Sequence, residues 1–481
     1  MDRVSLVRAL VDRLHRKERR SAVEKSLDLR ASGSIDFVAH TLLAWVLSSR
    51  DDYQGSRKIA DEHTVQRLLN LTWHMSASTQ ALALFGKNPF LAMRNMAIQQ
   101  SAPQENLLQS AFGRSWVIFS VLPPNHRLRV FIEAMTDMPL KDSMALVLLF
   151  SMSFLQGDSA LLKSRIFQYA RNAFSTFPRL RTLLIANKNA ALSECNLLGS
   201  KFDSLFAPSQ FIRYPLINVA GSIEVVDPVS AAKTGEHFFA RLIEEFGEED
   251  HKRELTRLYE AYANARLIST QPSGAVVGQD LRKIVRHGKA CDQFVRIDSE
   301  CVLLVEIKCR AVASNKMMAI SESYLSSLLS DVVNVGFTQL ANTRDQLTQC
   351  GEIKATDRVV MLLVTRENFF LPQSEMLAEV MPGLKPLMEK LTADSRSEFC
   401  NCCLDEYDAR LDLAAAGRVS LADFFSAAGS SGLSPIRSRS GLHGRLRTSA
   451  EIHVAQHLHE AMTEASEHAG RLIERLMERK Y

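Results

Sequence analysis

No stretch of this 481-residue chain is both apolar and long enough to cross a bilayer. The longest apolar run, MALVLLFSMSFL at residues 144–155, contains two serines and falls short of the roughly 20 residues that a spanning helix needs. The N-terminal residues are charged throughout and lack the uninterrupted apolar stretch of a secretory signal. We therefore expect a cytoplasmic protein without a membrane partner, in which residues 144–155 form a buried helix.

Cysteine motifs and phosphate-binding loops are also lacking. The eight cysteines have no regular spacing, which argues against a disulfide framework. The cluster Cys400-Asn401-Cys402-Cys403 has no matching Cys or His pair nearby, so a structural role is favoured over a zinc site. No glycine-rich phosphate loop supports ATP hydrolysis. The net charge of +4 permits an anionic partner without demanding one.

The hydrophobic pattern predicts a multidomain protein, because the chain is too long for one ordinary domain. Apolar residues spaced by three and four predict an all-α N-terminal domain over residues 1–205. From residue 206 to 428, helices at 234–247, 254–268 and 316–349 alternate with strands, which predicts an α/β domain with a mixed sheet. Further elements follow: a strand at 357–365, a helix near 374–381, mixed structure to 428, a Gly/Ser/Pro linker at 429–446 and an amphipathic C-terminal helix at 447–481.

The stretch CDQFVRIDSECVLLVEIKCR, residues 291–310, carries the chemistry. Val302 to Val305 are all apolar, which predicts a strand that is buried on both faces. Glu306 and Lys308 follow directly and share one face of that strand. Burying their charges costs several kcal/mol unless each is paired or bound to a metal. Such charges in a strand of this kind indicate a functional site.

The hairpin loop sets the partner of Glu306. Asp298-Ser299-Glu300 fits a three-residue loop, which pairs Ile297 with Cys301 and places Asp292 opposite Glu306. Directly opposed residues have Cβ atoms about 5 Å apart. Two carboxylates at that distance repel each other, so a cation is expected between them.

These residues resemble the active-site signature of the PD-(D/E)xK nuclease superfamily, which has the restriction-endonuclease-like fold. The matching pattern is Asp292, thirteen intervening residues and Glu306-Ile307-Lys308, with a helix before the strand pair and a helix and strand after it. The resemblance covers about residues 230–370. Cys291 stands where the superfamily often has a proline.

The resemblance implies a Mg²⁺ or Mn²⁺ site formed by Asp292, Glu306 and the main-chain carbonyl of Ile307. Lys308 would orient or activate a water, or stabilise the phosphate. The superfamily often adds a glutamate on the helix before the strands, for which Glu236 is the candidate, and a glutamine on the helix after them, for which Gln339 is the candidate. A solvated position on the helix surface is the favoured alternative for Glu236 and an equal alternative for Gln339.

The implied function is metal-dependent hydrolysis of phosphodiester bonds, in DNA more than in RNA, in a restriction, repair or anti-phage defence setting. One alternative is a non-catalytic nucleic-acid-binding or assembly module, and another is a nuclease that a partner releases. The N-terminal domain or the C-terminal helix would then bind that partner or form a homo-oligomer. Basic residues flank the motif and are candidates for nucleic-acid contacts, with a merely charged loop rim as the alternative: Lys283, Arg286, His287, Lys289, Arg310 and Lys316.

Overall fold

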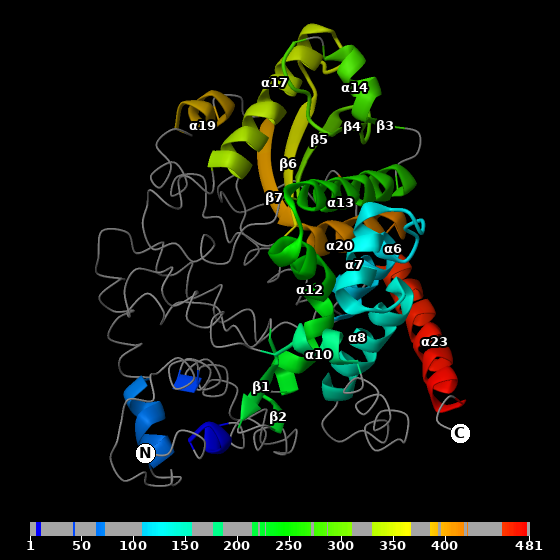
Figure 1. Cartoon of the computed structure of the whole chain (residues 1–481). Coiled ribbons are helices and arrows are strands. Elements are labelled where there is room, and N and C mark those ends of the chain that lie inside the picture. The colour runs from blue at the N-terminus through cyan, green and yellow to red at the C-terminus, as the bar shows by residue number, and fades with distance from the viewer. Residues whose placement is uncertain are drawn as a thin grey trace. The chain divides into compact units, whose positions relative to one another are not determined.

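The architecture was obtained from a computed structural model. It describes residues 6–10, 42–43, 64–72, 108–155, 177–185, 214–219, 222–226, 228–270, 274–285, 287–309, 330–366, 385–392, 396–417, 421 and 455–478. The chain divides into two compact units, which we name the helical unit, Met1–Gly247 with His457–Tyr481, and the sheet unit, Glu248–Gln456. Figure 1 gives the elements of each unit.

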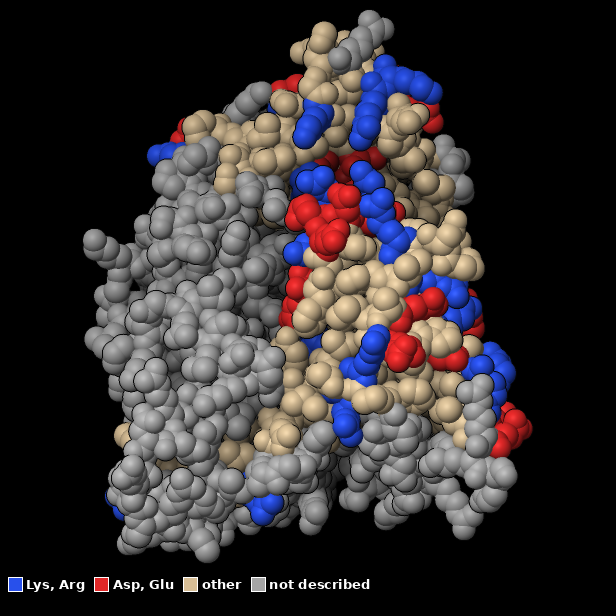
Figure 2. Space-filling model, viewed as in Figure 1, with Lys and Arg blue, Asp and Glu red and all other residues tan. Residues whose placement is uncertain are grey.

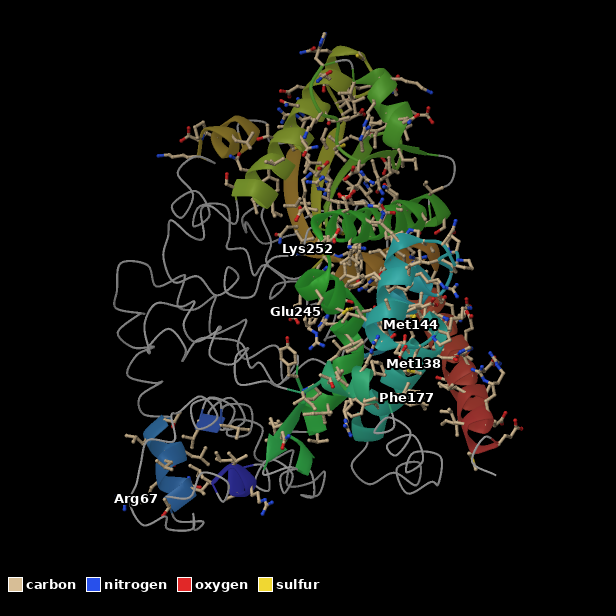
Figure 3. All side chains as sticks on the ribbon, viewed as in Figure 1. Arg67, Met138, Met144, Phe177, Glu245 and Lys252 are labelled. Atoms are coloured by element: carbon tan, nitrogen blue, oxygen red, sulfur yellow. The ribbon has the colours of Figure 1, made fainter. Side chains whose placement is uncertain are left out.

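The described part of the helical unit is built around a long buried helix, α8. This helix covers the apolar run predicted to be buried, and Met144 to Phe150 are at most 7% exposed. Figure 3 marks Met144 on α8 and Met138 just before it, both of which are buried. The elements of this unit are η1 (Leu108–Phe112), α6 (Gly113–Phe119), α7 (Arg127–Thr136), α8 (Leu140–Leu155), α10 (Pro178–Thr182), β1 (Leu216–Val219), β2 (Ser222–Val225) and α12 (Pro228–Phe246).

The C-terminal helix α23 (Gln456–Glu478) completes the helical unit. Asp142 of α8 accepts hydrogen bonds at 2.8 Å from Arg475 and shares a second 2.8 Å contact with the His468 ring. Gly113 of α6 approaches the same helix so closely that an added Cβ would lie 2.7 Å from the carbonyl oxygen of Leu458. The amphipathic C-terminal helix is therefore confirmed over Gln456–Glu478, and it contacts both α6 and α8.

The sheet unit contains a five-stranded mixed sheet with the strand order β3-β4-β5-β6-β7. The first three strands pair antiparallel, and β5, β6 and β7 run parallel to one another. Val302 to Val305 in the central strand β5 are all 0% exposed, as the apolar run predicts. The strands are β3 (Ala275–Val277), β4 (Gln293–Arg296), β5 (Cys301–Lys308), β6 (Arg358–Thr365) and β7 (Ser397–Cys403).

Helices cover both faces of this sheet. The bounds are α13 (Glu249–Thr270), α14 (Gly278–Ile284), η4 (Ser330–Asn334), α17 (Val335–Gln349), α19 (Lys385–Thr392) and α20 (Leu404–Ala415). On one face, Gly336 of α17 packs against Leu363 and Glu306. On the other face, the side chain of Gln293 contacts Asn264 of α13 and Tyr407 of α20. Alternation along β5 thus directs Glu306 and Lys308 toward α17.

Most of the elements predicted for residues 206–428 are confirmed, with extended bounds. The expected helices at 234–247 and 254–268 are the longer α12 and α13, and the strand at 357–365 is β6. Strands β3 and β7 and helix α14 were not predicted. The helix near 374–381 and the linker at 429–446 lie outside the described residues. Among the described helices, none combines the length and apolar character needed to span a membrane.

Candidate functional site

The predicted hairpin register is confirmed. Gln293 pairs with Val305 and Arg296 pairs with Val302, so the loop consists of Asp298, Ser299 and Glu300. The next position beyond the Gln293–Val305 pair brings Asp292 opposite Glu306. The amide of Glu300 donates to Oδ1 of Asp298 at 2.8 Å, which closes the turn locally.

Asp292 is anchored by the main chain of the neighbouring strand. Its Oδ2 accepts a 2.8 Å hydrogen bond from the amide of Ile307, and its own amide donates to the carbonyl of Val305 at 3.0 Å. In an extended strand, the N–H and C=O of one residue point to the same edge. The carbonyl of Ile307 therefore faces the edge where the Asp292 carboxylate lies, as a shared metal site would need.

Glu306 has a buried carboxylate of which one oxygen accepts a hydrogen bond and the other, within the described part of the chain, does not. Its side chain is 1% exposed, and Oε1 accepts a hydrogen bond from Nζ of Lys308. Oε2 is buried and has no hydrogen-bond partner among the described residues. Burial, followed by the nearby Asp292 carboxylate, raises the pKa of Glu306 to about 8. Without a cation, this group resists ionisation at neutral pH.

The same environment acts on Asp292. Burial raises its pKa above the ordinary value, while the Ile307 amide, Lys308 and Arg282 act in the opposite direction. The carboxyl groups of Asp292 and Glu306 share one amine, that of Lys308. One positive charge does not compensate two buried negative charges, so ionising both carboxyls is unfavourable. A divalent cation would relieve both the burial and the repulsion.

Lys308 connects the motif to the helix that follows it. Besides contacting Glu306, its Nζ donates a 2.9 Å hydrogen bond to Oε1 of Gln339 on α17. Nε2 of Gln339 in turn donates to the carbonyl of Ala290 at 3.4 Å. The glutamine singled out from the sequence therefore touches the lysine and also the segment that leads into Asp292.

On the preceding helix α13, Glu260 is an acidic residue whose charge interacts with Asp292 and Lys308. Two contacts place α13 here: Asn264 bonds Gln293 at the start of β4, and the Tyr259 ring lies 5.5 Å from Arg366, just after β6. Glu260 lies between these anchors. Burial, followed by the Asp292 charge, raises its pKa to about 7, while Lys308 and then Arg257 act in the opposite direction.

Glu236, the acidic residue singled out from the sequence, stays a prediction. Glu236 lies on α12 in the helical unit, and α13 separates it in sequence from the motif strands. Its side chain is not among those described. Tyr259, Tyr262 and Ala263 are buried and mark the face of α13 that Glu260 borders, which is a signal in the sequence that points to Glu260.

The donor set fits a hard divalent cation. No cluster of three or more His, Cys, Asp or Glu side chains arranged to hold a metal occurs in the described part of the chain. A pair of carboxylates with a main-chain carbonyl is instead present at Asp292, Glu306 and Ile307. The buried Oε2 of Glu306, which has no hydrogen-bond partner among the described residues, fits a cation ligand, because such an atom is costly without a partner. Oxygen donors of this kind suit Mg²⁺ or Mn²⁺.

Basic residues lie on α14 and the segment after it. Lys283 is exposed and pairs with Asp280 at 2.6 Å, whereas Lys289 and His287 are exposed. Arg282 is also exposed, and its charge acts on Asp292. Figure 2 shows lysine and arginine atoms beside acidic ones over the part of the surface where α13 and α14 lie in Figure 1. The side chains of Arg286, Arg310 and Lys316 lie outside the described residues.

Comparisons with models of known protein families, with curated protein sequences and with solved structures found no match to this chain.

Proposed function

We propose that this protein is a metal-dependent nuclease that hydrolyses phosphodiester bonds, with DNA as the favoured substrate. The observation that carries the proposal is the buried Oε2 of Glu306, which has no hydrogen-bond partner among the described residues, beside Lys308 and opposite Asp292. A protein without need of a cation would gain little from burying these acidic groups together. The mixed sheet and the order of its elements support a restriction-endonuclease-like unit.

Each residue of the site would have a role that follows from its chemistry. Asp292, Glu306 and the carbonyl of Ile307 would hold Mg²⁺ or Mn²⁺, with Glu260 as an additional carboxylate near the same cluster. The bound ion would lower the pKa of a water and offset negative charge that develops on the phosphate. Lys308 donates hydrogen bonds at the edge of the cluster, where its ammonium can stabilise that charge. Gln339 fixes the position of the amine.

Substrate contacts would come from the exposed cations on α14 and just after it, Arg282 and Lys289 foremost. Arginine and lysine bind phosphates without regard to base identity, so they position the chain rather than select a sequence. The helical unit would bind a partner or select the substrate, as in a restriction, repair or defence system.

The decisive test is cleavage by the purified full-length protein. Plasmid DNA, single-stranded DNA and RNA are incubated with Mg²⁺, with Mn²⁺ and with a chelator. Wild type, Lys308→Ala and Glu306→Ala are compared, and Lys385→Ala on α19 is the matched lysine control. We expect metal-dependent cleavage that both motif variants reduce by about 100-fold or more and that the control retains.

Two outcomes would contradict the proposal. The first is cleavage by Lys308→Ala at the wild-type rate, which would assign the activity to other residues or to a contaminant. The second is inactivity with every substrate and metal, together with equal growth of cells that overproduce wild type or Glu306→Ala. Nucleic-acid binding without cleavage would then favour a non-catalytic module. Toxicity of wild type alone would instead identify a nuclease that needs a cellular trigger.

A further inference from the structure

One face of α17 holds the segment that leads into Asp292. Residues 287–291 connect α14 to β4 and turn at Gly288, which has φ +82°. The main-chain amides and carbonyls of this segment are not part of the hydrogen-bond ladders between the strands. Where such groups are buried, they need hydrogen-bond partners outside the sheet. Gln339, Thr343 and Gln346 recur at intervals of four and three, so they lie on one face of α17.

Each of these three side chains binds main-chain atoms of the segment. Oε1 of Gln346 accepts a 2.9 Å hydrogen bond from the amide of His287, and its Nε2 donates to the His287 carbonyl. Oγ1 of Thr343 accepts a 2.8 Å hydrogen bond from the amide of Cys291. The Gln339 amide reaches the carbonyl of Ala290, as described above. Thus α17 holds both ends of the segment.

Thr343 is the buried member of the set. It is 0% exposed, and the Cys291 to which it binds is 2% exposed. Its hydroxyl donates to the carbonyl of Gln339 at 2.8 Å, which turns an oxygen lone pair toward the Cys291 amide. Without the hydroxyl, the amide directly before Asp292 would be left buried with no partner from α17.

We propose that Thr343 and Gln346 are positioning residues that fix the Asp292 carboxylate for metal binding. The same helix carries Gln339, which holds Lys308, so one rigid element sets both the acidic and the basic side of the site. This inference rests on the proposed metal-dependent function. Partners of this indirect kind typically change metal affinity or activity by about 10–100-fold when they are removed.

The test measures Mn²⁺ affinity of the full chain by the paramagnetic resonance signal of free Mn²⁺. The variants are Thr343→Val, Thr343→Ser and the more exposed Gln346→Ala, with Thr348→Val as the matched control. Thr348 lies on the same helix and donates to the carbonyl of Arg344 within it. We expect Thr343→Val and Gln346→Ala to weaken Mn²⁺ binding by about 10-fold, Thr343→Ser to restore it and Thr348→Val to leave it unchanged.

Cleavage kinetics and hydrogen exchange supply the second readout. In both weakening variants we expect kcat to fall more than KM for nucleic acid, and the amides of residues 287–292 to exchange faster. Wild-type Mn²⁺ affinity in folded Thr343→Val and Gln346→Ala would overturn the positioning role alone. If wild type binds Mn²⁺ no better than Glu306→Gln does, the metal site itself is wrong and both proposals fall.

Discussion

The amide of Ile307 donates a 2.8 Å hydrogen bond to Oδ2 of Asp292, at the point where the β4–β5 ladder ends. A side-chain oxygen of Asp292 thereby takes an amide of the neighbouring strand as its partner. The orientation of the carboxylate is fixed by the main chain before any ligand arrives. Such pre-organisation lowers the cost of ordering a ligand set when a cation binds.

The buried carboxyls predict that the metal-free protein becomes less stable as pH rises. Glu306 has a folded pKa of about 8 and an ordinary value of 4.5, so the folded state holds a proton that the unfolded state has lost between these values. The free energy of unfolding should therefore be highest below pH 4.5 for this group and fall as pH rises to about 8. We expect Glu306→Gln to flatten this decline.

Thermal melts in chelator at pH 6 and pH 9 measure the effect. The difference between the folded and the ordinary pKa of Glu306 corresponds to at most about 5 kcal/mol in the free energy of unfolding. The Glu306→Gln variant should therefore melt several degrees above wild type at pH 9. Glu352→Gln, at an exposed position, controls for the loss of one negative charge. A lower melting temperature for Glu306→Gln than for wild type at pH 9 would show that the ionised pair with Lys308 stabilises the protein.

Glu260 should matter more than Glu236. Replacing Glu260 with glutamine removes a carboxylate whose charge interacts with Asp292 and Lys308. We expect Glu260→Gln to weaken Mn²⁺ binding and cleavage by about 10-fold or more, and Glu236→Gln to have a far smaller effect. Equal losses in the two variants, measured by titration and by initial rates, would restore the choice made from the sequence.

Arg282 should contact substrate phosphate more than its neighbour Lys283 does. The amide of Gly278, one turn before Arg282 on α14, donates to the carbonyl of Asp292 at 3.1 Å, while Lys283 pairs with Asp280. In a Glu306→Gln background that leaves the DNA intact, binding is titrated against salt. Arg282→Gln should reduce the slope of log affinity against log salt by about 1, and Lys283→Gln by less. The reverse order would contradict this assignment.

Gly113 should tolerate no side chain. An alanine Cβ at this position would lie 2.7 Å from the Leu458 carbonyl oxygen, so α23 would have to shift. We expect Gly113→Ala to lower the free energy of unfolding by about 1–3 kcal/mol, despite the better helix propensity of alanine. Gly470→Ala is the matched control, since nothing lies within 4 Å of its added Cβ, and it should be neutral or slightly stabilising. Denaturant unfolding would distinguish the two.

The hairpin could be predicted because local signals determine it. Four consecutive apolar residues identify a strand buried on both faces, and the loop length alone fixes the register that pairs Gln293 with Val305. Strand β7 has the sequence SEFCNCC, with neither alternation nor β-branched residues, and it pairs only because parallel β6 lies beside it. The three residues of β3 are too few for any pattern.

Glu260 illustrates a different limit. The helix that contains Glu260 was predicted. Which face of this helix meets β4 depends on the contact of Asn264 with Gln293. It also depends on the contact of Tyr262 with Asp408, and these two residues are 146 positions apart in the sequence. The pattern of one helix shows which residues are buried, not what they are buried against. The sequence alone therefore does not show that the charge of Glu260 acts on Asp292.

Because α23 returns to pack on α6 and α8, the sheet unit is effectively inserted into the helical unit between Gly247 and His457. A continuous gene fragment can encode the inserted body, whereas its host can be made only by rejoining two distant segments of the chain. A frameshift anywhere in the sheet unit would thus also remove α23 from the helical unit. Loss of the sheet unit and damage to the helical unit would then occur together.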